Sequence, residues 1–141
     1  MLYTNSDGGA RGNPGPGAIG IIVRDEGNIL TKHSSFIGRN VTNNIAEYQA
    51  LIVALELASK FRKEVTCILD SELVVKQLLG KYRVKKPELL ELFLKVQKIQ
   101  EKFDKITYKY SSREDRFQQM ADELVNQELE NQGYPKKRFY K

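Results

Sequence analysis

Residues 2–17 read LYTNSDGGARGNPGPG, a short run that carries one carboxylate and is followed by glycines and prolines. The pattern predicts a strand over residues 2–7 that brings Asp7 to its end, with a glycine-rich turn directly after it. Five glycines exceed the needs of one tight turn, while Pro14 and Pro16 fix the backbone and remove two amide donors. We therefore expect a rigid loop whose backbone can approach a ligand closely. The alternative is an ordinary hairpin connection between two strands.

The length and the cysteine content bound the class of protein. The 141 residues predict a single domain over 1–141, in which residues 132–141 form a flexible basic tail. Cys67 is the only cysteine, which excludes an internal disulfide, and its apolar neighbours predict a buried thiol. No apolar run approaches the roughly 20 residues of a membrane span, and no leader pattern opens the chain. We expect a soluble, cytoplasmic domain.

The charged residues and the histidine content narrow the possible ligands. The formal net charge of +5, from 23 Lys and Arg against 18 Asp and Glu, is compatible with a polyanionic partner but does not identify one. His33 is the only histidine, so nitrogen and sulfur ligands are too few for a zinc site. Any metal would be held by oxygen. We interpret His33 as a partly exposed residue of the third strand.

The remaining pattern predicts a mixed α/β chain. After the first strand, further strands are expected over residues 18–23, 29–37, 65–69 and 106–110. Helices are expected over 45–58, over 72–79 and after Pro87, followed by a last helix with the apolar stripe Ala121, Leu124, Val125 and Leu129. The order βββαβααβα begins with an antiparallel meander and continues with strands that need helical crossovers. A single mixed sheet covered by helices follows from this order.

Four acidic residues stand where the pattern brings them toward the sheet: at the end of the first strand, on the packed face of the first helix, directly after strand 65–69 and beside the last apolar stripe. They are Asp7, Glu47, Asp70 and Asp122. If the first and fourth strands are neighbours, these carboxylates share one small volume, in which Mg²⁺ or Mn²⁺ would offset their repulsion. Two such ions about 4 Å apart can activate water and stabilise a leaving oxygen in phosphodiester hydrolysis. Spacing alone does not prove this, since a hydrogen bond to the backbone or to Tyr48 would account for Glu47 and a helix cap for Asp70.

Motifs around these acids resemble those of the ribonuclease HI family along nearly the whole chain. The motifs are Ser6-Asp7-Gly8 with Gly12-Asn13-Pro14-Gly15-Pro16-Gly17, Thr42-Asn43-Asn44-Ile45-Ala46-Glu47, Leu69-Asp70-Ser71 and Ala121-Asp122-Glu123-Leu124. Each motif alone is a weak signal, whereas all four in order at family-like separations are a strong one. The resemblance implies the ribonuclease H fold, a five-stranded mixed sheet in the order 3-2-1-4-5 flanked by helices. It also implies hydrolysis of the RNA strand of RNA/DNA hybrids.

The same resemblance implies roles for individual residues. The four acids would be catalytic and would hold Mg²⁺ or Mn²⁺, with two ions per site when substrate is bound. Thr42 and Asn43 match positions that hold a phosphate of the DNA strand, while Gly12, Asn13 and Asn44 match positions that contact the minor groove. A hybrid has a wide minor groove with 2′-hydroxyls on one strand, which amide side chains and exposed backbone can recognise. A helix-capping role is the alternative for Asn43 and Asn44.

The sequence also departs from the family pattern. The loop before the last helix lacks the histidine that many members carry there, and Arg113 or Glu114 is the candidate replacement. The basic, tryptophan-containing handle of well-studied bacterial members is missing. Cations of residues 81–86 or of the basic tail are candidates for phosphate contacts in its place, with plain surface charge as the alternative. Glu72 stands where many members carry an amide, which leaves that substrate contact in doubt.

The leading hypothesis is therefore a metal-dependent endoribonuclease that acts on RNA/DNA hybrids as a monomer, with no membrane and no obligatory protein partner. A DNA nuclease or transposase-like enzyme of the same fold is one alternative, disfavoured because such enzymes usually need extra domains. A hybrid-binding module without turnover is a second, disfavoured because all four acids are present. A domain of a reverse transcriptase polyprotein is a third, and Met1 close to the first strand argues against it.

Overall fold

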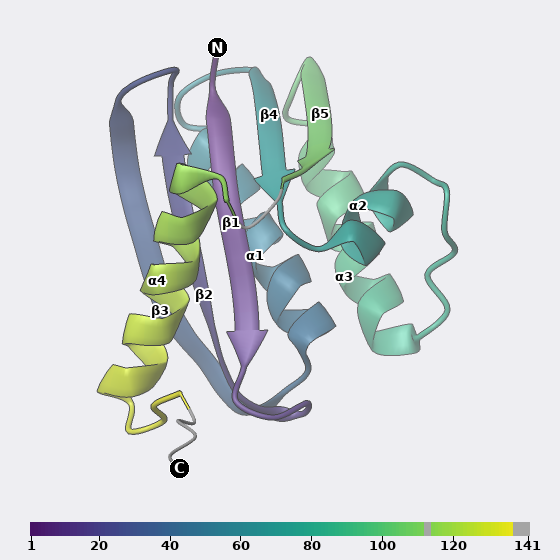
Figure 1. The fold of residues 1–141 in the computed structure, drawn as a ribbon. Helices are drawn as coiled ribbons and strands as arrows, with labels where there is room; N and C mark the ends of the chain where they lie inside the picture. The colour runs from purple at the N-terminus through teal and green to yellow at the C-terminus, as the bar shows by residue number, and fades with distance from the viewer. Residues whose placement is uncertain (112–113, 137–141) are drawn as a thin grey trace.

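The computed structural model describes residues 1–111 and 114–136, which form a five-stranded mixed sheet in the order β3-β2-β1-β4-β5 (Figure 1). The strands are β1 Tyr3–Ala10, β2 Gly15–Arg24, β3 Ile29–Val41, β4 Glu64–Leu69 and β5 Lys105–Tyr110. The helices are α1 Asn43–Ala58, α2 Glu72–Leu78, α3 Pro87–Gln100 and α4 Arg116–Asn131. The predicted element order, the mixed sheet and the strand order are confirmed.

The helices cover the two faces of the sheet unequally. α1 packs against β1 and β2 on one face with α3 behind it, whereas α4 alone lies across β1, β2 and β3 on the other face (Figure 1). The larger apolar core lies on the α1 side, and a smaller cluster of Ala18, Val125 and Leu129 lies under α4. In the part of the chain that the structure describes, no helix is both long and apolar enough to cross a membrane.

The local sequence explains where these elements begin and end. Thr42 and Ser71 cap α1 and α2 by accepting hydrogen bonds from backbone amides three residues later. Pro87 starts α3, and Gly80 has a φ of 79° after α2. Cys67 is buried in β4 as predicted, and His33 is half-buried on β3.

The first strand is longer than the sequence pattern predicts. Residues 8–10 were expected to form a turn, but they continue β1 and pair with β2, where Gly8 lies opposite Ile19 and Ala10 opposite Gly17. Asp7 is therefore inside the strand, opposite Gly20, and the connecting loop is confined to residues 11–14. The glycines fit the strand because they allow neighbouring backbones to come close, which is a use of glycine other than turn formation.

Two glycines set the distance between the sheet and its helices. A Cβ at Gly8 would overlap the backbone of Ala46 in α1, and a Cβ at Gly20 would overlap the backbone of Ala121 in α4. Ala46 directly precedes Glu47, and Ala121 directly precedes Asp122. The missing side chains therefore allow two helices to carry carboxylates close to β1.

Replacing Gly8 by alanine is expected to lower the free energy of unfolding by roughly 1–3 kcal/mol, because the new methyl group overlaps helix backbone. Gly27→Ala is the matched control, since nothing lies within 4 Å of its added methyl group. Urea denaturation followed by circular dichroism measures both variants. Equal unfolding free energies for the two would contradict the close approach of α1 to β1.

Candidate active site

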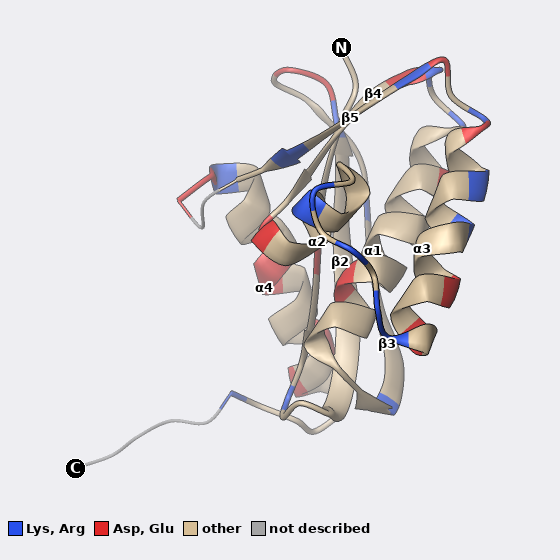
Figure 2. Ribbon diagram, turned by 90° about the vertical axis from the view of Figure 1, so that its right-hand side faces the viewer, with Lys and Arg blue, Asp and Glu red and all other residues tan. Residues whose placement is uncertain are grey.

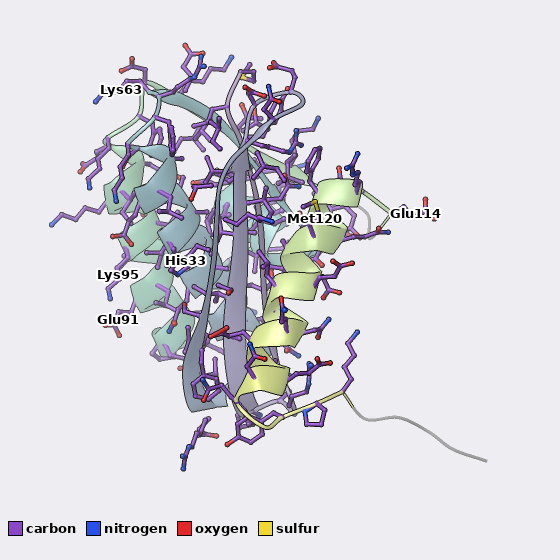
Figure 3. The ribbon with its side chains drawn as sticks, turned by 90° about the vertical axis from the view of Figure 1, so that its left-hand side faces the viewer. His33, Lys63, Glu91, Lys95, Glu114 and Met120 are labelled. Carbon is purple, nitrogen blue, oxygen red and sulfur yellow. The ribbon has the colours of Figure 1, made fainter. Side chains whose placement is uncertain are left out.

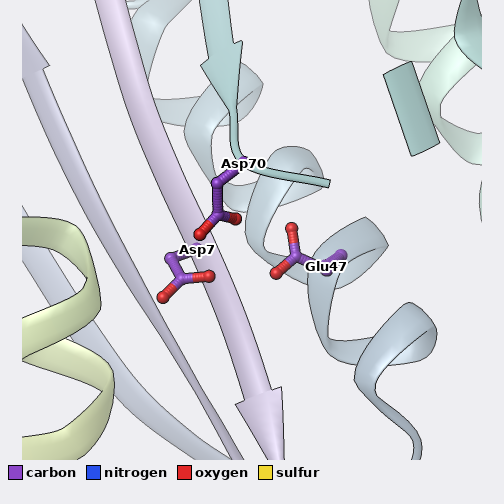
Figure 4. A group of neighbouring side chains, drawn as sticks. All are labelled: Asp7, Glu47 and Asp70. Carbon is purple, nitrogen blue, oxygen red and sulfur yellow. The ribbon is translucent and has the colours of Figure 1, made fainter. Parts of the chain in front are cut away.

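Three carboxylates from distant parts of the chain converge at the centre of the sheet. Asp7 comes from β1, Asp70 directly follows the neighbouring parallel strand β4, and Glu47 comes from α1. Because Ser6 pairs with Leu69, the residues that follow them lie side by side. One oxygen from each of the three side chains lies within 4.8 Å of the others, and the side chains point toward one another (Figure 4).

Glu47 is held in place by the backbone of β1. Its side chain is only 7% exposed, and the Gly8 amide donates a hydrogen bond to its Oε1 at 3.1 Å. Its Oε2 is buried and has no hydrogen-bond partner among the described residues. The alternative explanation of Glu47 therefore accounts for only one of its oxygens, since the Tyr48 hydroxyl instead donates to Gln77 Oε1 at 2.6 Å.

The proximity of the acids changes their protonation. Burial, followed by the charges of Glu47 and Asp70, raises the pKa of Asp7 far above its usual range, and Asp122 adds to this effect. Burial and the charge of Asp70 also raise the pKa of Glu47, although hydrogen bonds from Asp7 and the Gly8 amide act in the opposite direction. Full ionisation of the group at neutral pH therefore needs a positive charge nearby. A divalent cation with oxygen ligands fits this donor set and the orphaned Glu47 oxygen.

Asp122 lies in the same cavity but outside the tight group. The cavity, of about 290 Å³, is lined by Asp7, Asp70 and Asp122, while only the other three acids meet within 4.8 Å. Asp122 is exposed on α4, and its Oδ2 accepts a hydrogen bond of 3.3 Å from the side-chain Nδ2 of Asn126. The structure thus brings the four predicted acids to one place. Three of them are close enough to one another to bind a single ion.

A buried glutamine joins α4 to β1, and the sequence analysis did not identify it. Gln118 is 1% exposed and lies one helical turn before Asp122. Its Nε2 donates to the carbonyl of Ser6 at 2.8 Å, and its Oε1 accepts from Asn5 at 3.1 Å. Gln118 therefore fixes the helix that carries Asp122 to the residue before Asp7. Its signal in the sequence was a polar residue in line with the apolar stripe of α4.

The residues predicted to bind substrate surround the start of α1. Thr42 Oγ1 caps the helix by accepting from the Ile45 amide at 3.2 Å. Asn43 accepts from the Ala10 amide through Oδ1, and its own amide donates to Asn13 Oδ1, each at 3.0 Å. Asn43 thus ties the loop to the helix and does not supply the side-chain cap, which is Thr42.

The same residues border two different hollows of the surface. Asn43 lines the acidic cavity. Asn44 lines a separate groove together with Asn13, Thr42 and Lys86. Gly12, in the loop between β1 and β2, has a φ of 97°, which an L side chain rarely adopts. The start of α1 therefore lies between the acidic cavity and a groove that is lined by both Lys86 and Glu88.

The candidate loop residues and cations lie at the periphery. Arg113 lies outside the described residues, whereas Glu114 is exposed just before α4 and far from His33 on β3 (Figure 3). Glu72 forms an ion pair with Lys76 at 2.6 Å. The link between α2 and α3 is rich in basic residues (Figure 2), with exposed side chains at Lys81, Arg83, Lys85 and Lys86. Of the predicted basic tail, residues 137–141 lie outside the described part.

Comparison with known proteins places the chain among ribonuclease H domains. The family model described as "Reverse transcriptase-like" matches residues 5–128. The bifunctional protein Rv2228c of Mycobacterium tuberculosis is 39% identical over 132 residues, which are 92% of this chain and 35% of that protein. Ribonuclease HI of Halobacterium salinarum is 38% identical over 134 residues, 92% of this chain and 65% of that protein. The chain thus spans about a third of the length of the first of these relatives.

Solved structures agree with the sequence comparison. LC11-RNase H1, solved in complex with an RNA/DNA hybrid, superposes with a TM-score of 0.87 at 42% identity, covering 94% of this chain and 99% of that one. The N-terminal RNase H domain of Rv2228c superposes with a TM-score of 0.87 at 36% identity, covering 94% and 95%. Both likenesses extend over nearly the whole chain.

Replacing Asp7 by asparagine is expected to stabilise the metal-free chain at pH 7.5 by about 1–3 kcal/mol. The pKa of Asp7 is higher in the folded chain than in the unfolded chain, where it is about 4. Above about pH 4, Asp7 therefore lowers the free energy of unfolding, and below about pH 4 this destabilisation disappears. The gain should therefore vanish near pH 4. Thermal denaturation at both pH values, with and without Mg²⁺, measures this, and Mg²⁺ should raise the melting temperature of the unaltered chain more than that of the variant.

Asp104→Asn serves as the control, because Asp104 is exposed and precedes β5 away from the cavity. It should leave the pH dependence and the Mg²⁺ response unchanged. A metal-free chain that is more stable than Asp7→Asn at pH 7.5 would show that the acids do not repel one another.

Proposed function

The chain belongs to the reverse transcriptase-like family and is homologous to ribonuclease HI, and from this we propose that it hydrolyses the RNA strand of RNA/DNA hybrids as a metal-dependent endoribonuclease. The observation that carries the proposal is the convergence of Asp7, Glu47 and Asp70 within 4.8 Å. A binding module has no need of such a costly cluster of buried acids. A hydrolase that uses oxygen-bound divalent ions does need one.

We propose Asp7, Glu47, Asp70 and Asp122 as the catalytic carboxylates and as the ligands of Mg²⁺ or Mn²⁺, with two ions per site when substrate is bound. Such ions activate a water and stabilise the leaving oxygen of a phosphodiester. The role of the protein is to hold these carboxylates in fixed positions. The Gly8 amide fixes Glu47, and Gln118 fixes the helix of Asp122 to Ser6. Both contacts are formed within the chain itself, which favours preorganised catalysis.

We propose that the start of α1 and the preceding loop recognise the hybrid. Thr42 and Asn43 would hold a phosphate of the DNA strand, in keeping with their position at a helix N-terminus. Gly12, Asn13 and Asn44 would contact the minor groove and its 2′-hydroxyls. The hydrogen bonds that join Asn13, Asn43 and Ala10 support this assignment, because they make the recognition surface continuous with β1.

Two further assignments concern the periphery. We propose Glu114 or Arg113 as the group that assists proton movement or product release from the loop before α4.

We also propose that residues 1–141 act as one monomeric domain in the cytoplasm. Size-exclusion chromatography with light scattering tests the monomer directly.

A cleavage assay on end-labelled substrates tests the proposed function. Hybrid, duplex RNA and duplex DNA of one sequence are incubated with the chain, with Mg²⁺, with Mn²⁺ or with a chelator. We expect cleavage of the RNA strand of the hybrid only when a divalent ion is present. Cleavage of duplex DNA in preference to the hybrid would favour a DNA nuclease, and binding of the hybrid without cleavage would favour a binding module.

Asp70→Asn is expected to reduce kcat on the hybrid by more than about a hundredfold while leaving hybrid affinity within about threefold, because a metal ligand is lost but the recognition surface is kept. Asp104→Asn is the control for loss of one surface carboxylate and should retain full activity. Steady-state kinetics and fluorescence anisotropy measure the two quantities. Turnover by Asp70→Asn near the unaltered rate would refute the assignment of the metal ligands.

A further inference from the structure

The chain turns sharply after α4. Gly133 adopts a φ of 92°, its amide donates to the carbonyl of Glu130 at 3.0 Å, and the Tyr134 amide donates to the carbonyl of Leu129 at 2.8 Å. These two bonds form a Schellman motif, which ends a helix. The residues after the turn, Tyr134 to Lys136, are referred to below as the C-terminal arm.

The C-terminal arm is clamped to the sheet at two points. The ring of Tyr134 stacks on Phe36 of β3, with centroids 6.2 Å apart and planes 7° from parallel. The Arg11 guanidinium donates from Nε to the carbonyl of Tyr134 at 3.1 Å and from a terminal nitrogen to Asn126 Oδ1 at 3.0 Å. Arg11 follows the last residue of β1, so the arm is fixed to the strand that carries Asp7.

The clamp brings a cation to the acidic cavity. Lys136 lines the cavity of Asp7, Asp70 and Asp122, and it also lines the adjoining groove of about 560 Å³ beside Arg11. Lys136 is exposed and forms no ion pair within residues 1–111 and 114–136. Lys136 therefore lines the same cavity as the acids while its side chain stays available to another anion.

We propose that Lys136 contacts a backbone phosphate of the hybrid next to the cleaved bond, and that Arg11 and Tyr134 are positioning residues that hold it there. This inference rests on the proposed function. A phosphate is the anion that the proposed substrate brings to this cavity, and a lysine is a suitable point charge for it. The arm would thereby supply one of the phosphate contacts for which the sequence has no separate handle.

Steady-state kinetics on the hybrid at several salt concentrations test the role of Lys136. Lys136→Ala should raise KM about threefold to fivefold at low salt and leave kcat within about twofold, because it removes one exposed phosphate contact. The slope of log KM against log salt should fall by about one. Lys136→Arg should restore both quantities. Unchanged KM and salt slope in Lys136→Ala would overturn the proposal.

Lys95→Ala provides the charge-matched control. Lys95 is exposed on α3, which lies on the other side of the sheet from α4 (Figure 3). It should leave KM and the salt slope unchanged. An equal effect in both variants would mean that only net charge matters, and this would also overturn the proposal.

A double-mutant cycle tests the positioning role of the arm. Tyr134→Ala removes the stacking on Phe36 and should raise KM about twofold, whereas Tyr134→Ala combined with Lys136→Ala should match Lys136→Ala alone. Fully additive effects would show that Tyr134 does not act through Lys136.

The outcomes also separate this inference from the proposed function. If the unaltered chain cleaves no hybrid, the proposed function fails. If the unaltered chain cleaves the hybrid and Lys136→Ala has the same KM and salt slope, only this inference fails.

Discussion

The close approach of two helix backbones to two strands determines the rest of the molecule. Gly8 admits α1 and Gly20 admits α4 to distances that any side chain at those positions would prevent. The contact at Gly8 also lets its amide reach the Glu47 carboxylate, so the same glycine provides both the space and the hydrogen bond. If α1 and α4 packed at an ordinary distance from the sheet, Glu47 and Asp122 would lie farther from Asp7.

The acidic cluster opposes folding, and a polar network beneath it offsets part of the cost. Arg24 is 7% exposed, lies over the rings of Tyr3 and Phe117, and donates to Asn5 Oδ1 at 2.9 Å. Asn5 in turn donates to Gln118, which holds the carbonyl of Ser6. The side chains of Arg24, Asn5 and Gln118 each have a hydrogen-bond partner in this network, which lowers the cost of burying them.

The sequence could predict the acids and the order of strands because each leaves a local mark. Asp70 follows an apolar strand, and Glu47 lies on the packed face of a long helical pattern. The continuation of β1 through Gly8 was missed because glycine serves turns and close packing equally well. Gln118 and Arg11 were missed because their partners, Ser6 and Tyr134, are more than a hundred positions away along the chain. No local pattern contains such a contact.

Arg11 also connects the two parts of the proposed site. Its guanidinium holds the arm of Lys136 and, through Asn126, the carboxylate of Asp122. A phosphate that enters the cavity is repelled by the acids until cations neutralise them, while the basic link after α2 and the arm attract it from a distance. Because the basic segments attract the substrate while the acids repel its central phosphate, the phosphates on either side of the cleaved bond would bind first. Ions held by the carboxylates, as proposed, would supply the positive charge that offsets this repulsion, so that metal and nucleic acid would each favour binding of the other.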